Sequence, residues 1–186
     1  MNFMPSKPLR TLLLALLATP AVLSTSCKKE DPHDHNESEL ITTVVYTLTP
    51  ATGGTPVTAT FRDLDGTGGA APTITPLTLA ANTSYIGTIT YLDETKNPAQ
   101  NISEEVRQEA NDHLVGYTSN PAGLLTIART DRDANMRELG LATTLRANAA
   151  GTGSLRVILY HQPGTKNATT NLNGSESDVT FPVTVQ

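Results

Sequence analysis

Hydrophobic and polar residues alternate along most of the chain after residue 40, in short runs that end at glycine, asparagine or aspartate. Period-two alternation places successive side chains on opposite faces of a strand, so these runs predict β-strands. The predicted strands cover residues 41–50, 56–61, 73–79, 85–92, 123–128, 139–145, 153–160 and 179–185. Short strands separated by turns predict an all-β domain, an antiparallel immunoglobulin-like β-sandwich, with a small open barrel as the alternative.

One stretch, about residues 101–116, departs from this alternation and has the features of a short helix inserted into the sandwich. Asn101 or Ser103 can cap the first turn, because a side-chain oxygen at that position accepts from a backbone N–H. Glu104 and Glu105 add negative charge where the helix dipole favours it. The sequence therefore predicts a single helix within a β domain.

The predicted helix carries a candidate metal site. On a helical wheel His113 falls within the apolar stripe and Glu109 at its margin, one turn earlier, so the two side chains can share one ion. Glu105 lies two turns from His113, which is too far. His161 follows a predicted apolar strand and is the candidate third ligand. Nitrogen and oxygen ligands favour zinc, and the alternative is a structural Glu109–His113 pair without metal.

The first 26 residues have the pattern of a secretory signal peptide, with Lys7 and Arg10, then a short apolar stretch, then small residues. The apolar stretch is too short to span a bilayer. Cys27, the single cysteine of the chain, follows directly, so we expect it to be the lipidated first residue of the mature protein.

A polar segment separates the predicted lipid anchor from the domain. We expect residues 1–26 to be the signal peptide, residues 27–39 a flexible tether and residues 40–186 the β-sandwich domain. His33 and His35 stand among carboxylates in the tether and form a second candidate site for transition metals. The alternative is that the tether is simply a solvated polar linker.

The charge of the chain limits its partners. Removing Lys7 and Arg10 with the signal peptide leaves 11 basic and 18 acidic residues, a net charge of −7. An acidic surface argues against nucleic acid as a partner. No nucleophile–base pair, metalloprotease motif or phosphate-binding loop is present, so we expect a binding protein and not an enzyme.

The segment Asp131-Arg-Asp-Ala-Asn135 carries the first three oxygen positions of a calcium-binding loop. Met136 stands where a glycine would turn that loop, and Ala142 stands where its final glutamate would be. We therefore expect a polar turn between strands at this segment and no calcium.

Three segments together resemble small surface lipoproteins of the Bacteroidetes. They are Cys27-Lys-Lys-Glu-Asp-Pro-His-Asp-His35, Ile102-Ser-Glu-Glu-Val-Arg-Gln-Glu-Ala-Asn-Asp-His113 and Leu155-Arg-Val-Ile-Leu-Tyr-His-Gln-Pro163. The resemblance implies that Lys29, Glu30 and Asp31 form an export tag for display on the outer face of the outer membrane. Such proteins are commonly encoded beside TonB-dependent receptors, which implies a possible receptor partner and a role in nutrient or metal capture.

Two functional hypotheses follow from these patterns. The first is an outer-membrane accessory that binds a transition metal or metal complex for uptake, with zinc as the possible cofactor. The second is a structural or adhesion module without metal, whose sandwich binds a protein or glycan. The fold alone does not choose between them.

Overall fold

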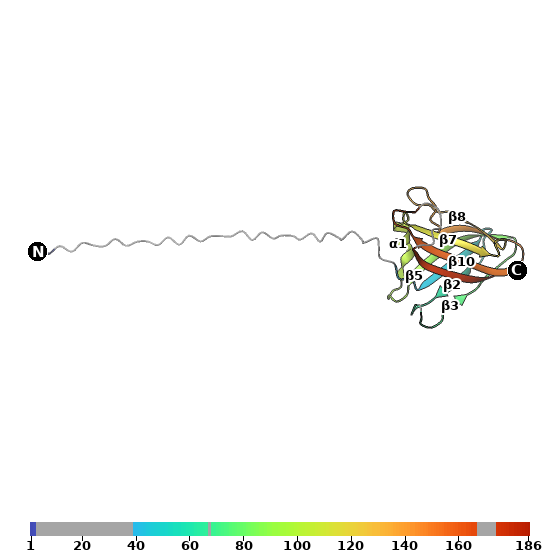
Figure 1. The fold of residues 1–186 in the computed structure, drawn as a ribbon, viewed down its shortest axis with the longest axis horizontal. Helices are drawn as coiled ribbons and strands as arrows, with labels where there is room; N and C mark the ends of the chain where they lie inside the picture. The colour runs from blue at the N-terminus through green and yellow to red at the C-terminus, as the bar shows by residue number, and fades with distance from the viewer. Residues whose placement is uncertain (3–38, 67, 167–173) are drawn as a thin grey trace. The chain divides into compact units, whose positions relative to one another are not determined.

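The chain forms two β-sheets in the computed structural model, which describes residues 1–2, 39–66, 68–166 and 174–186 (Figure 1). The first sheet has the strand order β3-β2-β1-β5-β9-β8, with β6 pairing to β5, and the second has the order β4-β11-β10-β7. The strands are β1 (Thr43–Pro50), β2 (Val57–Arg62), β3 (Thr73–Thr75), β4 (Leu77–Leu79), β5 (Thr83–Asp93), β6 (Gln100–Asn101), β7 (His113–Asn120), β8 (Leu125–Arg129), β9 (Ala142–Ala147), β10 (Gly151–His161) and β11 (Ser175–Val185). All neighbouring strands are antiparallel except β4 and β11.

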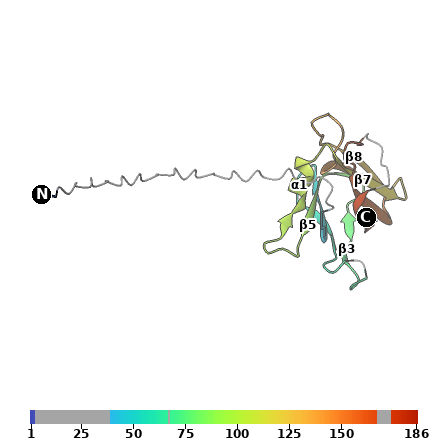
Figure 2. The same cartoon turned by 60° about the vertical axis from the view of Figure 1, so that its left-hand side comes forward.

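The predicted β-sandwich is confirmed. In Figure 2, β5 of the first sheet and β7 of the second lie in different layers. Alternate side chains of both sheets point inward and form one large core, which includes Tyr46, Tyr91 and Phe181, all fully buried. Burying these aromatic and aliphatic side chains is the main stabilising term, because no disulfide is available to a chain with a single cysteine.

The predicted strand 73–79 is two strands in different sheets. β3 pairs with β2 in the first sheet, whereas β4 pairs with β11 in the second. Pro76 stands between them and has no backbone N–H for a ladder, so the chain leaves one sheet there and joins the other. This crossing places β2 and β11, from opposite sheets, near each other.

The predicted helix 101–116 is wrong in its length. Helix α1 (Ile102–Gln108) has seven residues and is capped by the Asn101 side chain, which accepts from the backbone N–H of Ser103 at 3.1 Å. A turn at residues 109–112 ends it, and β7 begins at His113. Pairing of β7 with β10 over eight residues outweighs the helical pattern, since Val115, Tyr117 and Thr118 also favour strands.

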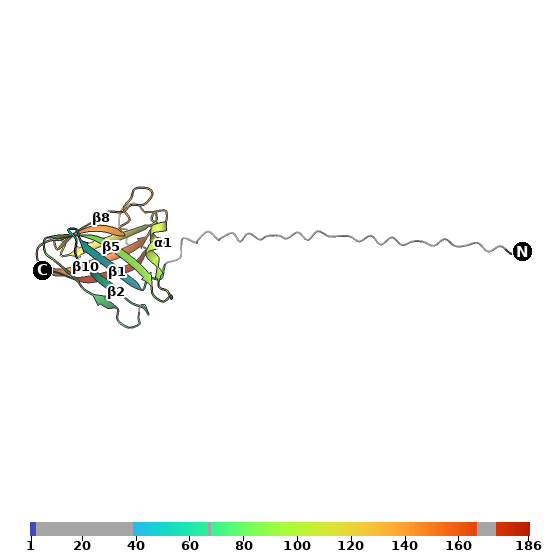
Figure 3. The same cartoon turned by 180° about the vertical axis from the view of Figure 1, so that it is seen from behind.

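Helix α1 lies at one end of the sandwich and the C-terminus at the opposite end, as Figures 1 and 3 show from opposite sides. β7 starts four residues after α1 ends and runs antiparallel to β10. The first residue of β7 and the last residue of β10 therefore meet at the α1 end of the second sheet.

Candidate metal centre

Two histidines lie directly opposite each other at this end of the second sheet. His113 is the first residue of β7 and His161 the last of β10, and the two are cross-strand partners. Their rings stack with centroids 4.6 Å apart and an angle of 3° between the planes. Both residues share the inward face with the alternating core residues Val115 and Leu159, so the imidazoles point into the sandwich.

A β-bulge brings a carboxylate to the two rings. The register of β10 with β11 steps from the Leu159–Ser177 pair to the Tyr160–Ser175 pair, so Glu176 has no partner in the ladder. A bulge redirects the side chain of its extra residue. Glu176 Oε2 lies 3.3 Å from His113 Nε2, and Oε1 lies 2.9 Å from His161 Nδ1.

A second carboxylate reaches the site from the segment that precedes β1. Glu39 Oε1 lies 3.7 Å from His113 Nε2. The exposed fractions of the side chains are 0% for His113, 3% for Glu176 and 7% for Glu39. We call Glu39, His113, His161 and Glu176 the His/Glu centre.

The backbone determines which nitrogen of His113 faces the two carboxylates. Its Nδ1 lies 3.1 Å from the carbonyl oxygen of Glu109. A carbonyl only accepts, so Nδ1 carries a proton and donates it there. Nε2 is then the nitrogen that faces Glu39 and Glu176, and in neutral His113 it presents a lone pair to them. This orientation of a histidine by a backbone carbonyl is typical of metal ligands.

The buried groups of the centre have strongly shifted pKa values. Burial raises the pKa of Glu176 to about 7. Burial alone lowers the pKa of His113, but hydrogen bonds to Glu176 and Glu39 outweigh it and raise that pKa to about 10. Burial also opposes ionisation of Glu39, yet hydrogen bonds to His113 and Glu176 lower its pKa to about 2. Protons on His113 and Glu176 therefore offset the carboxylate charge when no metal is bound.

Buried polar atoms without a hydrogen-bond partner among the described residues gather at the centre. They include Glu39 Oε2, His161 Nε2, Glu176 Oε1 and the hydroxyl of Tyr91. Glu176 Oε1 is near His161 Nδ1 but is not aligned with it for a hydrogen bond. The pKa of Tyr91 is raised by its burial and by the charge of Glu176, which places the hydroxyl near this carboxylate. Unpaired buried atoms are costly, so such a cluster suits an ion or water.

Two sets of three side chains can each hold a metal ion, with their ligand atoms within 4.8 Å of one another. One is the set predicted from the sequence, Glu109, His113 and His161. The other is Glu39, His113 and Glu176. The structure thus brings the three predicted residues together, although not along one helix face. Glu109 is the C-cap of α1, and His113 belongs to a strand.

Ring geometry favours the second set. A metal lies close to the plane of each imidazole that binds it, because the lone pair lies in that plane. The planes of His113 and His161 are stacked and nearly parallel, so one ion cannot lie in both without a side-chain rotation. Ligand atoms on a tetrahedral zinc stand about 3.3–3.6 Å apart, given bonds of about 2.0–2.2 Å. The separation of 3.3 Å from His113 Nε2 to Glu176 falls in that range, and the separation of 3.7 Å to Glu39 lies just above it.

Sequence reasoning missed two of these three residues. Glu39 was placed at the end of the tether, and Glu176 in a polar loop before the last strand. The sequence around Glu39 and Glu176 contains no motif that indicates a ligand. The one available signal is that Glu39 directly precedes the apolar residues that lead into the first predicted strand. The other predicted site residues, Cys27, Lys29, Glu30, Asp31, His33 and His35, lie outside the described residues.

A second buried charge cluster supports the turn that leads into His113. Lys166 Nζ lies 3.0 Å from Asp133 Oδ2 and donates to the carbonyl of Ala110 at 2.7 Å. Arg137 also pairs with Asp133 Oδ2, at 3.0 Å, and donates to the carbonyls of Asn111 and Lys166. We call Asp133, Arg137 and Lys166 the clamp.

The clamp also accounts for the segment that resembles a calcium loop. Asp133 Oδ1 accepts from the backbone N–H groups of Asn135 and Arg137, while Oδ2 faces the two cations. Met136 adopts φ 63°, the conformation that glycine would supply in a calcium loop. With both oxygens of Asp133 occupied by protein donors, this segment is the polar turn that the sequence predicts.

Comparisons with known proteins give no family for this chain. No family model matches it, and no curated protein matches it. Among solved structures, the crystal structure of domains 4 and 5 of the S-layer protein SbsC is similar with a TM-score of 0.32 and 14% sequence identity, covering 75% of each chain. Within the described residues, no helix is both long and apolar enough to cross a membrane.

Proposed function

We propose that this chain is a surface-anchored lipoprotein whose sandwich binds a transition-metal ion, with zinc favoured. The ligands are His113 Nε2 and the carboxylates of Glu39 and Glu176. The observation that carries the proposal is this buried nitrogen, oriented by a backbone carbonyl and facing two carboxylates at 3.3 Å and 3.7 Å. One nitrogen and two oxygen ligands suit zinc, and three protein ligands leave a fourth position for water.

His161 has a supporting role in this proposal. Its Nδ1 lies 2.9 Å from Glu176 Oε1, the oxygen that does not face His113. A contact of this kind orients a ligating carboxylate and tunes its basicity. Glu109 acts through its backbone carbonyl, which fixes the ring of His113.

The biological role in this proposal is that of an accessory to outer-membrane uptake. Lipidation at Cys27 and the tag at residues 29–31 keep the domain at the cell surface, and a TonB-dependent receptor is the candidate partner. Support comes from the signal-peptide pattern, the single cysteine and the resemblance to Bacteroidetes lipoproteins. Replacing Cys27 by alanine should release the protein from the membrane fraction, because that residue carries the whole anchor.

Calorimetric titration with zinc tests the metal site. The chain from residue 27 onward, carrying Cys27→Ser to prevent acylation and His33→Ala and His35→Ala to remove the tether imidazoles, should bind one zinc ion per chain. Glu176→Gln and His113→Ala should each abolish this binding. Glu104→Gln changes the same chemical group on the exposed face of α1 and should leave it unchanged.

The titration also separates the alternatives. If the variant without tether histidines takes up no zinc while the unaltered tether does, the metal site belongs to His33 and His35. If neither form binds zinc, the His/Glu centre is a proton-linked structural cluster, and the structural or adhesion hypothesis is favoured.

A further inference from the structure

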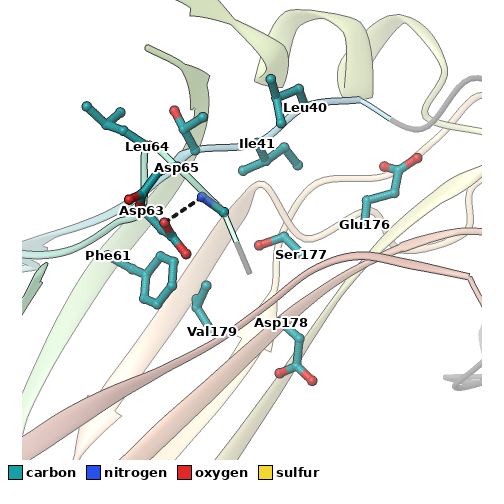
Figure 4. Close-up of a pocket in the computed structure, with 12 residues that line it drawn as sticks. Leu40, Ile41, Phe61, Asp63, Leu64, Asp65, Glu176, Ser177, Asp178 and Val179 are labelled. Carbon is teal, nitrogen blue, oxygen red and sulfur yellow. Dashed lines mark hydrogen bonds between the residues drawn. The ribbon is translucent and has the colours of Figure 1, made fainter. Parts of the chain in front are cut away.

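A pocket of about 380 Å³ adjoins the proposed metal site. Its lining includes Glu176 and also Leu40, the residue directly after Glu39. The pocket therefore lies beside both chain segments that supply the carboxylate ligands. Figure 4 shows Asp63 and Asp65, from the turn after β2, across the pocket from Glu176 and Ser177.

The charged residues that line this pocket are all acidic. They are Asp63, Asp65, Glu176 and Asp178, and none of its described lining residues is lysine, arginine or histidine. In Figure 4 the carboxylate of Asp178 points away from the wall formed by Asp63 and Asp65. Arg156 pairs with Asp178 at 2.5 Å and offsets its charge. Among the described residues no cation pairs with Asp63 or Asp65, and backbone N–H groups hold both, from Gly66 at 2.9 Å and Ala70 at 2.8 Å.

Glu176 connects the pocket to the buried ligands. Its side chain is almost completely buried, its Oε1 has no hydrogen-bond partner among the described residues, and it borders both the pocket and His113. The lining also contains apolar residues, among them Ile41, Phe61 and Val179. A low-dielectric wall beside like charges focuses their field and raises the local concentration of cations.

We infer that this pocket is the route by which a hydrated divalent cation, and not a metal–chelate complex, reaches Glu176 and the metal site. The inference rests on the proposed metal function. Chelators that hold metals through carboxylate or phenolate oxygens are commonly anionic, and the pocket carboxylates without a cationic partner among the described residues, Asp63 and Asp65, repel them. The ion exchanges its waters for the side chains of Glu176, His113 and Glu39, all of which are too buried to contact a bulky complex.

Stopped-flow zinc binding, followed by competition with a fluorescent zinc indicator, tests the route. The Asp63→Asn/Asp65→Asn variant keeps an oxygen for each backbone N–H and removes two charges. At an ionic strength of about 0.01 M its association rate constant should fall about 10-fold. The difference should vanish at about 1 M salt, where the screening length is about 3 Å. The Glu104→Gln/Glu105→Gln variant also removes two charges, on α1 and outside the pocket, and should lower the rate constant far less than the pocket variant does, because those charges do not line the route.

A second measurement tests the class of ligand. Zinc supplied as its nitrilotriacetate complex should be bound only as fast as the complex releases the ion, and the chelator should not co-elute with the protein. Co-elution of zinc and chelator at one-to-one stoichiometry would overturn the inference. So would zinc binding by the Asp63/Asp65 variant at the unaltered rate in low salt. Failure of the unaltered chain to bind zinc at all would instead refute the proposed function.

Discussion

The two buried charge clusters of this domain differ in which groups neutralise their carboxylates. In the clamp, one carboxylate faces two permanent cations, and both oxygens of Asp133 have donors. In the His/Glu centre, two carboxylates face imidazoles and each other, and several buried atoms have no hydrogen-bond partner among the described residues. In the clamp, protein groups satisfy both oxygens of Asp133. In the His/Glu centre, the carboxylate charges must be balanced by protons or by a bound cation.

This difference separates a structural ion pair from a binding site. A buried pair with all its hydrogen bonds made holds two loops in place and gains nothing from a ligand. A cluster whose counter-charge is supplied by titrating groups can exchange those protons for a metal. The clamp donates hydrogen bonds to backbone carbonyls in the turn before His113. It therefore helps to position His113 within the His/Glu centre.

Breaking the clamp should have the largest effect on stability. Lys166→Met leaves the buried Asp133 with Arg137 as its one remaining cation in the clamp, and removing one member of a buried pair costs up to about 3–5 kcal/mol of unfolding free energy. Urea denaturation should show a similar loss with zinc and with a chelator present. A loss below about 1 kcal/mol would place the pair among weak surface ion pairs. Lys166→Met combined with Asp133→Leu should recover part of the loss, since the one charge left over, Arg137, is about a third exposed and keeps its hydrogen bonds to backbone carbonyls.

A substitution that removes a charge from the His/Glu centre should affect zinc binding more than it affects the stability of the metal-free protein. Glu176→Gln should cost the metal-free protein little stability above pH 7, where the buried carboxylate is ionised against its preference. It should abolish the stabilisation by zinc, which in the unaltered chain amounts to about 2.7 kcal/mol at a concentration 100 times the Kd. Thermal unfolding with and without zinc measures both effects. Equal zinc stabilisation in the variant and the unaltered chain would exclude Glu176 as a ligand.

His161→Phe distinguishes the two possible ligand sets. Phenylalanine keeps an aromatic ring against His113 but removes the nitrogen near Glu176. If His161 only orients the ligand Glu176, the zinc Kd should rise about 10–100-fold. A complete loss of zinc binding, measured by competition with an indicator, would favour the set of Glu109, His113 and His161.

The pH dependence should have opposite signs for the empty and the loaded centre. The raised pKa of His113 stabilises the empty fold below about pH 6.5 and is lost as pH rises through about 10. The raised pKa of Glu176 disfavours the fold increasingly as pH rises from 4.5 through about 7. The unfolding free energy of the empty protein should therefore increase on acidification from pH 8 to pH 5, by on the order of 1 kcal/mol.

Zinc affinity should fall over that same pH interval, because protons on His113 and Glu176 compete with the ion. The clamp should not contribute to either change, since its hydrogen bonds and cations lower the pKa of Asp133 to about 2 despite burial. Its stabilisation is present above the ordinary aspartate pKa and is lost only as pH falls through about 2. Affinity that rises on acidification would contradict the ligand assignment.

The sequence predicts the sandwich because alternation is a local pattern, and most strands repeat it. The sequence did not predict strand β7, because residues 109–114 fit a helical stripe. The partners of β7 in β10 lie 34 to 48 residues away, so no local pattern indicates their pairing. His113 was predicted from a helical wheel, although it belongs to a strand, and His161 was predicted as the one other histidine of the domain. Glu176 was missed because its direction depends on a bulge, which the register of two strands sets and no single residue reveals.

The position of Glu39 has a mechanical consequence. It lies four residues before β1, and the first backbone hydrogen bond of that segment to the sheet is made by Thr42, to the carbonyl of Leu92. In a chain tethered through Cys27, tension along the tether would reach Glu39 before it reached any strand. If the proposed anchor and metal site both exist, stretching the tether would displace Glu39 while leaving the sandwich intact, so pulling on the anchor would weaken metal binding without unfolding the domain.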